Sequence, residues 1–104
     1  MLDTTIYLMR LIRLATADEW MTLHRKGGLS CPEGGYIHLC TEVQASLVKE
    51  SVYGPAKVLI LEVEANVDDL QWEPAEGDDE AVHGLFPHLY ADLPLKNIVA
   101  LREF

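Results

Sequence analysis

Apolar positions recur with two different periods along the chain, and each change of period separates an expected strand from an expected helix. Runs rich in Ile, Leu, Val and aromatic residues are typical of strands. The strands expected on this basis are residues 6–14, a short segment around His38, and residues 57–64, 70–73, 86–91 and 96–102. Residues 57–64 are apolar on both faces of the pleat, which favours a central position in a sheet.

A capping box predicts the first helix. Thr16 and Glu19 have the spacing at which a hydroxyl and a carboxylate satisfy each other's backbone N–H groups. Gly27-Gly28 then predicts the end of the helix, because glycine adopts the left-handed conformation that follows a last turn. The face expected from the i, i+3, i+4, i+7 spacing consists of Ala17, Trp20, Met21 and His24.

Thr41 and Gln44 repeat the capping signal directly after the His38 segment. They predict a second helix over about residues 42–51. Its expected buried face is Val43, Leu47 and Val48. The pattern as a whole therefore predicts a single compact α+β domain over residues 1–104, with two helices and about five or six strands. Residues 74–84, which are polar, acidic and glycine-containing, are predicted to form a mobile loop.

Composition supports an independently folding cytoplasmic domain. Apolar residues make up 49 % of the 104 residues, which is enough for a core without a metal or a disulfide. Cys31 and Cys40 lack zinc-site spacing and are expected to be reduced. Arg10 and Arg13 interrupt the first apolar run, so we expect neither a signal segment nor a membrane span.

Charge is distributed unevenly, which narrows the expected partners. The net charge is -9, and residues 58–95 contain ten acidic residues and no lysine or arginine. Broad nucleic-acid binding is therefore not expected, because affinity for phosphate backbones comes from clustered basic side chains. A single phosphate or nucleotide could still be held locally by Arg10, Arg13, Lys49 or Lys57.

The segment around His38 is the first candidate for chemistry. Alternation places Tyr36, His38 and Cys40 on one face of a strand, opposite the core-facing neighbours of His38. His38 could act as a general acid or base, donate to a ribose or phosphate, bind a metal, or be a hydrogen-bonded structural histidine. Cys40 could pair with His38 as a nucleophile, although a buried cysteine is more often packing. Free N–H groups of the helix start after Thr41 could hold an anion.

A second aromatic cluster near the end of the chain repeats this pattern. His88 and Tyr90 share a strand face by their i, i+2 spacing. Trp72 could stack on a ring and Glu73 could accept from hydroxyl groups, or they could be a core anchor and a solvated charge.

Acidic and histidine side chains near the end of the chain could also bind a divalent cation. The candidate ligands are Asp78, Asp79, Glu80, His83 and His88. They lack the spacing of known sites, so a solvated acidic loop is expected and no metal is.

These segments together resemble the small bacterial proteins of domain-of-unknown-function family 952. The resemblance extends from about residue 11 to residue 99. The matching pieces are Ala17-Asp18-Glu19-Trp20, Gly35-Tyr36-Ile37-His38-Leu39-Cys40-Thr41, residues 59–63, Leu70-Gln71-Trp72-Glu73-Pro74 and Phe86-Pro87-His88-Leu89-Tyr90 with the five residues after it.

That family is similar to a minimal ADP-ribosyltransferase fold, nearest the catalytic half of RNA 2′-phosphotransferases. The resemblance implies split sheets around a nucleotide cleft, NAD as a cofactor, and a role for His38, whose segment matches a His-Leu-Ser motif. It places Arg13 at the position of a histidine that contacts the dinucleotide. Glu73 is the only candidate for the glutamate of the protein-modifying members, and the RNA-binding domain has no counterpart.

Three functions follow as alternatives. The first is an NAD- or ADP-ribose-dependent transferase or hydrolase acting at the ribose, with His38 and His88 as catalytic residues. The ligand-binding residues expected with it are Arg13, Tyr36, Thr41, Trp72, Glu73 and Tyr90. The second is a module that binds a nucleotide or small metabolite without turning it over. The third is an acidic domain that binds a basic protein partner.

Overall fold

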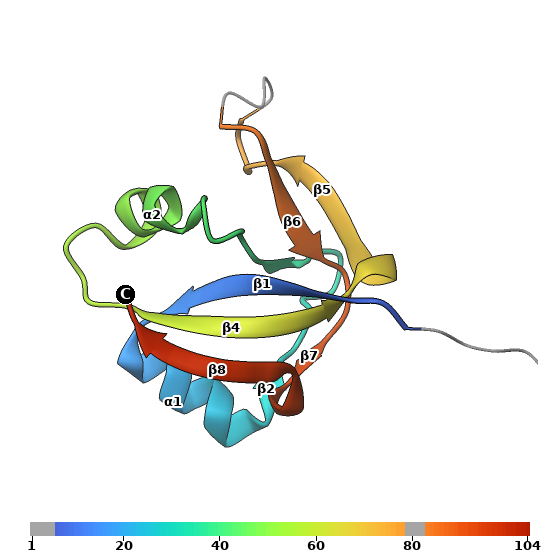
Figure 1. Ribbon diagram of the computed structural model, residues 1–104, viewed down its shortest axis with the longest axis horizontal. Coiled ribbons are helices and arrows are strands. Elements are labelled where there is room, and N and C mark those ends of the chain that lie inside the picture. The colour runs from blue at the N-terminus through green and yellow to red at the C-terminus, as the bar shows by residue number, and fades with distance from the viewer. Residues whose placement is uncertain (1–5, 79–82) are drawn as a thin grey trace, which may run out of the picture.

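Three antiparallel sheets and two helices make up residues 6–78 and 83–104, the part of the chain that the computed structural model describes (Figure 1). The α+β class expected from the sequence is confirmed. The described residues contain eight strands rather than five or six. The additional ones are β2 (Gly28–Leu29) and β7 (Leu93–Pro94), which pair only with each other.

The largest sheet has the order β1-β4-β8 and runs through the middle of the molecule (Figure 1). Its strands are β1 (Leu8–Ala15), β4 (Leu59–Asn66) and β8 (Ile98–Glu103). The predicted central position of the third apolar run is confirmed, because β4 pairs with a strand on each side. Successive residues of β4 alternate between the two faces, so Leu61 and Val63 face one way and Ile60 faces the other.

The second three-stranded sheet carries most of the candidate site residues and has the order β3-β6-β5. Its strands are β3 (Ile37–His38), β5 (Leu70–Pro74) and β6 (Leu85–Leu89). Shortly after β3, Cys40 exchanges two backbone hydrogen bonds with Ile12 of β1, at 2.8 and 2.9 Å. One continuous segment therefore links the two sheets.

Helix α1 (Ala17–Lys26) forms as the capping signals predict. Thr16 accepts from the backbone N–H of Glu19 at 3.1 Å, and the Glu19 side chain accepts from the Thr16 N–H at 2.8 Å. Gly27 ends the helix in the left-handed conformation, with φ 84°. The helix buries Leu23 and packs Trp20 against the core, whereas Met21 is exposed, so its inner side is rotated from the face expected from spacing.

The second helix differs from its prediction. It consists of α2 (Ala45–Val48) followed by a π-helical segment, Lys49–Tyr53, and residues 42–44 form a turn. Both side-chain hydrogen bonds of the expected Thr41–Gln44 box are present, at 3.0 and 3.2 Å. Because the helix begins after this turn, Val43 points outward and is 91 % exposed, and Ala45 is the buried residue. The prediction that Val43 is buried is wrong.

Two apolar clusters occupy opposite faces of the β1-β4-β8 sheet. The larger one joins the sheet to α1 and to the β3-β6-β5 sheet, and its buried members are Leu11, Ala15, Leu23, Ile37, Leu39, Leu61, Val63, Ala65, Leu70, Leu89 and Leu93. The smaller one lies under α2, and its buried members are Ile12, Leu14, Cys40, Ala45, Ile60 and Phe86. In Figure 1 the two helices accordingly lie on opposite sides of the sheet.

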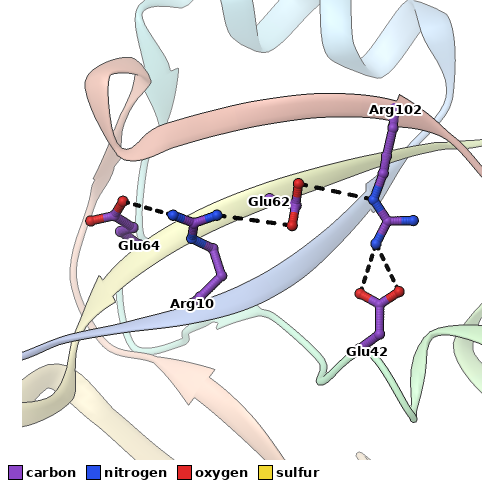
Figure 2. A network of polar contacts seen from close by, with 5 residues as sticks. All are labelled: Arg10, Glu42, Glu62, Glu64 and Arg102. Carbon is purple, nitrogen blue, oxygen red and sulfur yellow. Dashed lines mark hydrogen bonds and ion pairs between the residues drawn. The ribbon is translucent and has the colours of Figure 1, made fainter.

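The part of the sheet face that α2 leaves open carries a network of charged side chains (Figure 2). Arg10 on β1 lies 3.2 Å from Glu64 and 3.9 Å from Glu62, both on β4. Arg102 on β8 contacts Glu62 at 3.9 Å and donates to both carboxylate oxygens of Glu42 at 2.7 Å. The last contact ties the turn before α2 to β8.

Two further observations concern the helices and the cysteines. No helix in residues 6–78 and 83–104 is long and apolar enough to cross a membrane. Cys31 and Cys40 are both free thiols. The loop predicted over residues 74–84 is described in part only, and Asp79 and Glu80 lie outside the described residues.

Candidate functional site

Two histidines face each other across neighbouring strands. His38 of β3 pairs with His88 of β6 in the antiparallel register, and directly opposed residues of such a pair project to the same face. Their ring centroids are 5.7 Å apart. The surroundings differ sharply, because the His38 side chain is 60 % exposed and that of His88 is 3 % exposed.

Tyr36 completes this aromatic group. Its ring stacks on His88 with a centroid distance of 3.9 Å and an interplanar angle of 13°. The same ring lies 4.7 Å from His38 and 5.4 Å from Tyr90. Burial raises the pKa of the Tyr36 phenol, and Glu76 and Glu73 add to the effect. The phenol therefore stays protonated at neutral pH and is a hydrogen-bond donor.

Glu73 holds the far side of this group. One of its carboxylate oxygens lies 2.9 Å from Nδ1 of His88 and accepts from the hydroxyl of Tyr90 at 2.7 Å. These two hydrogen bonds, that of Tyr90 first, lower the pKa of Glu73. The hydrogen bond between Tyr90 and Glu73 also raises the pKa of the Tyr90 phenol to about 12. This pairing favours the ionised carboxylate of Glu73 and the protonated phenol of Tyr90.

A pocket of about 560 Å³ lies between this histidine pair and the helical segment α2 with its π-helical extension. His38, His88 and Arg13 supply its principal polar groups, together with Glu19 and Glu76. The helical segment supplies Leu47, Val48, Ser51, Val52 and Tyr53, and the strands add Ile12, Leu14 and Phe86. An apolar cavity with a few convergent polar groups is the usual form of a small-molecule site.

Arg13 is the cation of this pocket. Its Nη1 donates to the main-chain oxygen of His38 at 2.8 Å, which fixes the guanidinium beside the end of β3. Its Nε is buried and has no hydrogen-bond partner. In residues 6–78 and 83–104 no carboxylate forms an ion pair with it. A guanidinium has five N–H donors, so Arg13 retains donors for an anionic ligand.

The two carboxylates at the pocket do not neutralise Arg13. Glu19 accepts from the Thr16 N–H at the start of α1. Glu76 lies at the exposed side, with its carboxylate 3.9 Å from Nε2 of His38. Burial, the nearby His88 and the Arg13 cation lower the pKa of His38, against an opposing effect of Glu76. His38 is consequently neutral at pH 7 and can accept a proton.

Cys40 also lines the pocket and is buried. Burial is the main cause that raises the pKa of its thiol to about 11, against the opposing effect of Arg13. A thiol with this pKa is almost entirely protonated at neutral pH, so Cys40 is poorly suited to act as a nucleophile.

The structure brings six of the eight predicted site residues together. Arg13, His38 and His88 line the pocket, and Tyr36, Glu73 and Tyr90 form the layer behind His88. Thr41 and Trp72 lie outside this group. Thr41 forms two hydrogen bonds with Gln44. Trp72 pairs with Pro87, and its side chain lies on the strand face opposite to that of Glu73.

The helical wall of the pocket does not follow from the sequence pattern. Tyr53 donates to the main-chain oxygen of Leu14 at 3.1 Å and so anchors the π-helical segment to β1. The apolar spacing of Leu47 and Val48 indicated a buried face but not which side chains would oppose it. Nothing in the local sequence joins this wall to His88, which lies far along the chain from it.

The candidate metal ligands can be compared with the structure. Within the part of the chain that the structure describes, no group of three or more His, Cys, Asp or Glu side chains is arranged to hold a metal ion. Of the ligands considered from the sequence, His83 and His88 both line the pocket.

Comparisons with known proteins identify a protein family and a protein of known structure that this chain resembles. The model of the family described as "Protein of unknown function (DUF952)" matches residues 14–101. The crystal structure of protein CC0527 from Caulobacter crescentus is similar, with 25 % identity and a TM-score of 0.71, over 91 % of this chain and 85 % of that one. Its solution NMR structure gives 26 % identity and a TM-score of 0.68, over 90 % and 83 %. Among curated proteins there is no match.

Proposed function

This chain belongs to the DUF952 family of proteins of unknown function, and from its own geometry we propose that the pocket binds NAD or an ADP-ribosylated compound and promotes transfer or hydrolysis at the ribose. In this reaction water or an acceptor hydroxyl attacks the ribosyl carbon as its bond to the leaving group breaks, which is nicotinamide in NAD and the modified group in an ADP-ribosylated compound. The attacking oxygen loses its proton to a histidine.

One observation carries the proposal: within residues 6–78 and 83–104, Arg13 is a cation without an anionic partner in a pocket that two histidines share. Partly buried cations are costly unless they are paired, and the described part of this chain supplies no pair. A pyrophosphate would supply the missing charge through charge-assisted hydrogen bonds. This also explains how a protein of net charge -9 can hold an anionic ligand.

His38 supports catalysis at the same place. Its side chain is exposed at the pocket, and its lowered pKa keeps the ring in the neutral form that accepts a proton. The backbone oxygen of His38 meanwhile orients Arg13. One residue therefore connects the group that would bind the phosphates with the group that would transfer the proton.

Titration calorimetry with NAD, ADP-ribose and uncharged adenosine tests the binding. We expect both anionic ligands to bind and adenosine to bind at least about tenfold more weakly, since each charge-assisted hydrogen bond contributes about 1.5–3 kcal/mol. Arg13→Gln should abolish this preference. Arg10→Gln is the matched control, because Arg10 lies on another part of the sheet in the network of Figure 2. Equal binding of all three ligands, or no effect of Arg13→Gln, would contradict the proposal.

A non-catalytic binding module is the second candidate, and the position of Glu73 favours it. The carboxylate that could take the part of a catalytic glutamate is occupied by His88 and Tyr90. Mass spectrometry of NAD after long incubation separates the candidates, because a binding module releases no nicotinamide. If the protein is an enzyme, His38→Ala should lower the rate about 10²-fold or more, with ligand affinity measured in parallel.

A further inference from the structure

The buried histidine of the pair is held by a carboxylate rather than by a backbone group. Nδ1 of His88 lies 2.9 Å from Glu73, whose same oxygen accepts from Tyr90. Glu73 lies in β5 and His88 in β6, two strands that pair with each other, and Tyr90 directly follows β6. The pairing of these strands therefore sets the distance between the carboxylate and the ring.

This arrangement determines which ring nitrogen carries the proton. An ionised carboxylate only accepts hydrogen bonds, so the nitrogen that faces Glu73 must be the donor. A neutral imidazole has one N–H, and its other nitrogen is then an acceptor. In the neutral ring Nε2 of His88 consequently presents a lone pair, and the hydrogen bond that His88 forms through its side chain within residues 6–78 and 83–104 is the one at Nδ1.

The carboxylate that holds Nδ1 of His88 does not border the pocket. His88 lines the pocket together with Arg13 and His38, whereas Glu73 and Tyr36 do not line it. Glu73 and Tyr36 instead border a separate hollow on the other side of His88. Stacking of Tyr36 on the ring, at 3.9 Å and 13°, opposes a flip that would exchange the two nitrogens.

We infer that Glu73 is a positioning residue that holds His88 with Nε2 as a bare acceptor in the pocket, and that the ligand is therefore a phosphorylated sugar or nucleotide with a free hydroxyl within reach of His88. The ligand class rests on the proposed function, because it requires that the pocket binds an anion at Arg13. The assignment changes the role expected for Glu73, which would not contact the ligand.

Nitrogen NMR of the histidine side chains tests the positioning role. At a pH above the imidazole titration range we expect His88 as the Nδ1–H form in the intact chain. Glu73→Ala should shift it toward the Nε2–H form that free imidazole side chains prefer, and Tyr90→Phe, which keeps the carboxylate, should leave it unchanged. An Nε2–H ring in the intact chain, or a ring insensitive to Glu73→Ala, would overturn the inference. Amide proton spectra show whether each variant remains folded.

Binding of AMP and of 2′,3′-dideoxy-AMP tests the ligand class, because the two have the same charge and differ only in hydroxyl groups. We expect the intact chain to bind AMP about tenfold more tightly, as one lost hydrogen bond to a buried acceptor predicts. Glu73→Ala should remove this difference and leave the binding of the dideoxy compound unchanged. Equal affinities would overturn the ligand class while the proposed anion site stands. Binding of neither compound would overturn both, and the NMR result alone would decide the role of Glu73.

Discussion

At the scale of single residues, one strand pairing gives its two histidines unlike properties. The His38 side chain is partly exposed at the pocket, and partial burial first, then His88 and Arg13, lower its pKa. His88 is enclosed by Tyr36 and fixed by Glu73. His38 can accept a proton at the open side, and His88 beside it has a fixed orientation. This arrangement suits two separate roles in one reaction.

The pKa of His38 can be tested directly. NMR titration of its ring should give a pKa below 6.5, and Arg13→Gln should raise it because a nearby cation is removed. Between 6.5 and the folded-state pKa the unfolded chain binds the proton and the folded chain does not, so stability falls as the pH drops through this range. His38→Gln should remove this part of the pH dependence. A pKa at or above 6.5 would contradict the assignment.

Alternation along short strands was enough to predict which of these aromatic side chains share a strand face. In each of two segments the side chains lie two positions apart, Tyr36 with His38 and His88 with Tyr90. The structure places all four in one group. The same rule separates Trp72 from Glu73, because adjacent strand residues face opposite sides. The approach of Arg13 to His38 could not be predicted, since it depends on the pairing of β1 with the segment after β3.

At the scale of elements, the paired strands β2 and β7 depend on one glycine. A Cβ on Gly28 would contact the main-chain oxygen of Leu93 and lie 2.9 Å from the backbone nitrogen of Leu95. The φ of Gly28 is 134°, in the left-handed region. Gly27, with φ 84°, has nothing within 4 Å of such an atom. Two adjacent glycines therefore serve different purposes, the first as a helix end and the second as a close backbone contact.

Substitution by alanine should separate these purposes. We expect Gly28→Ala to lower the free energy of unfolding by about 3 kcal/mol or more, because backbone strain and overpacking add together. Gly27→Ala should cost about 1–2 kcal/mol, which is the cost of the left-handed conformation alone. Urea unfolding of both variants measures the difference. Similar losses would show that the contact with Leu93 relaxes without cost.

An element could be predicted from the sequence when the residues that cause it lie within the element itself. Helix α1 is specified by its own cap and its own terminal glycine, and β4 by a continuous apolar run, and both were predicted. Strands β2 and β7 have two residues each, too few to show a period. The outward position of Val43 arises because a turn precedes α2, and a capping motif alone does not reveal the turn.

At the scale of the whole molecule, stability should reside mainly in the larger apolar cluster. Leu61 has 0 % exposure at the centre of β4. Leu61→Ala should lower the free energy of unfolding by about 2–5 kcal/mol, whereas Val43→Ala should change it by less than about 0.5 kcal/mol because that side chain is in solvent. Denaturant unfolding of both variants checks this. A large effect of Val43→Ala would contradict the exposed position of this residue.

The division of the apolar residues between two faces of one sheet has an evolutionary consequence. Leu61 and Val63 face the cluster that joins α1 to both larger sheets, whereas Ile12 and Leu14 face the pocket. Substitutions beneath α2 can therefore reshape what the cavity accepts while the opposite face continues to hold the strands together. A protein built in this way can acquire new ligands by drift in one layer without first losing its architecture.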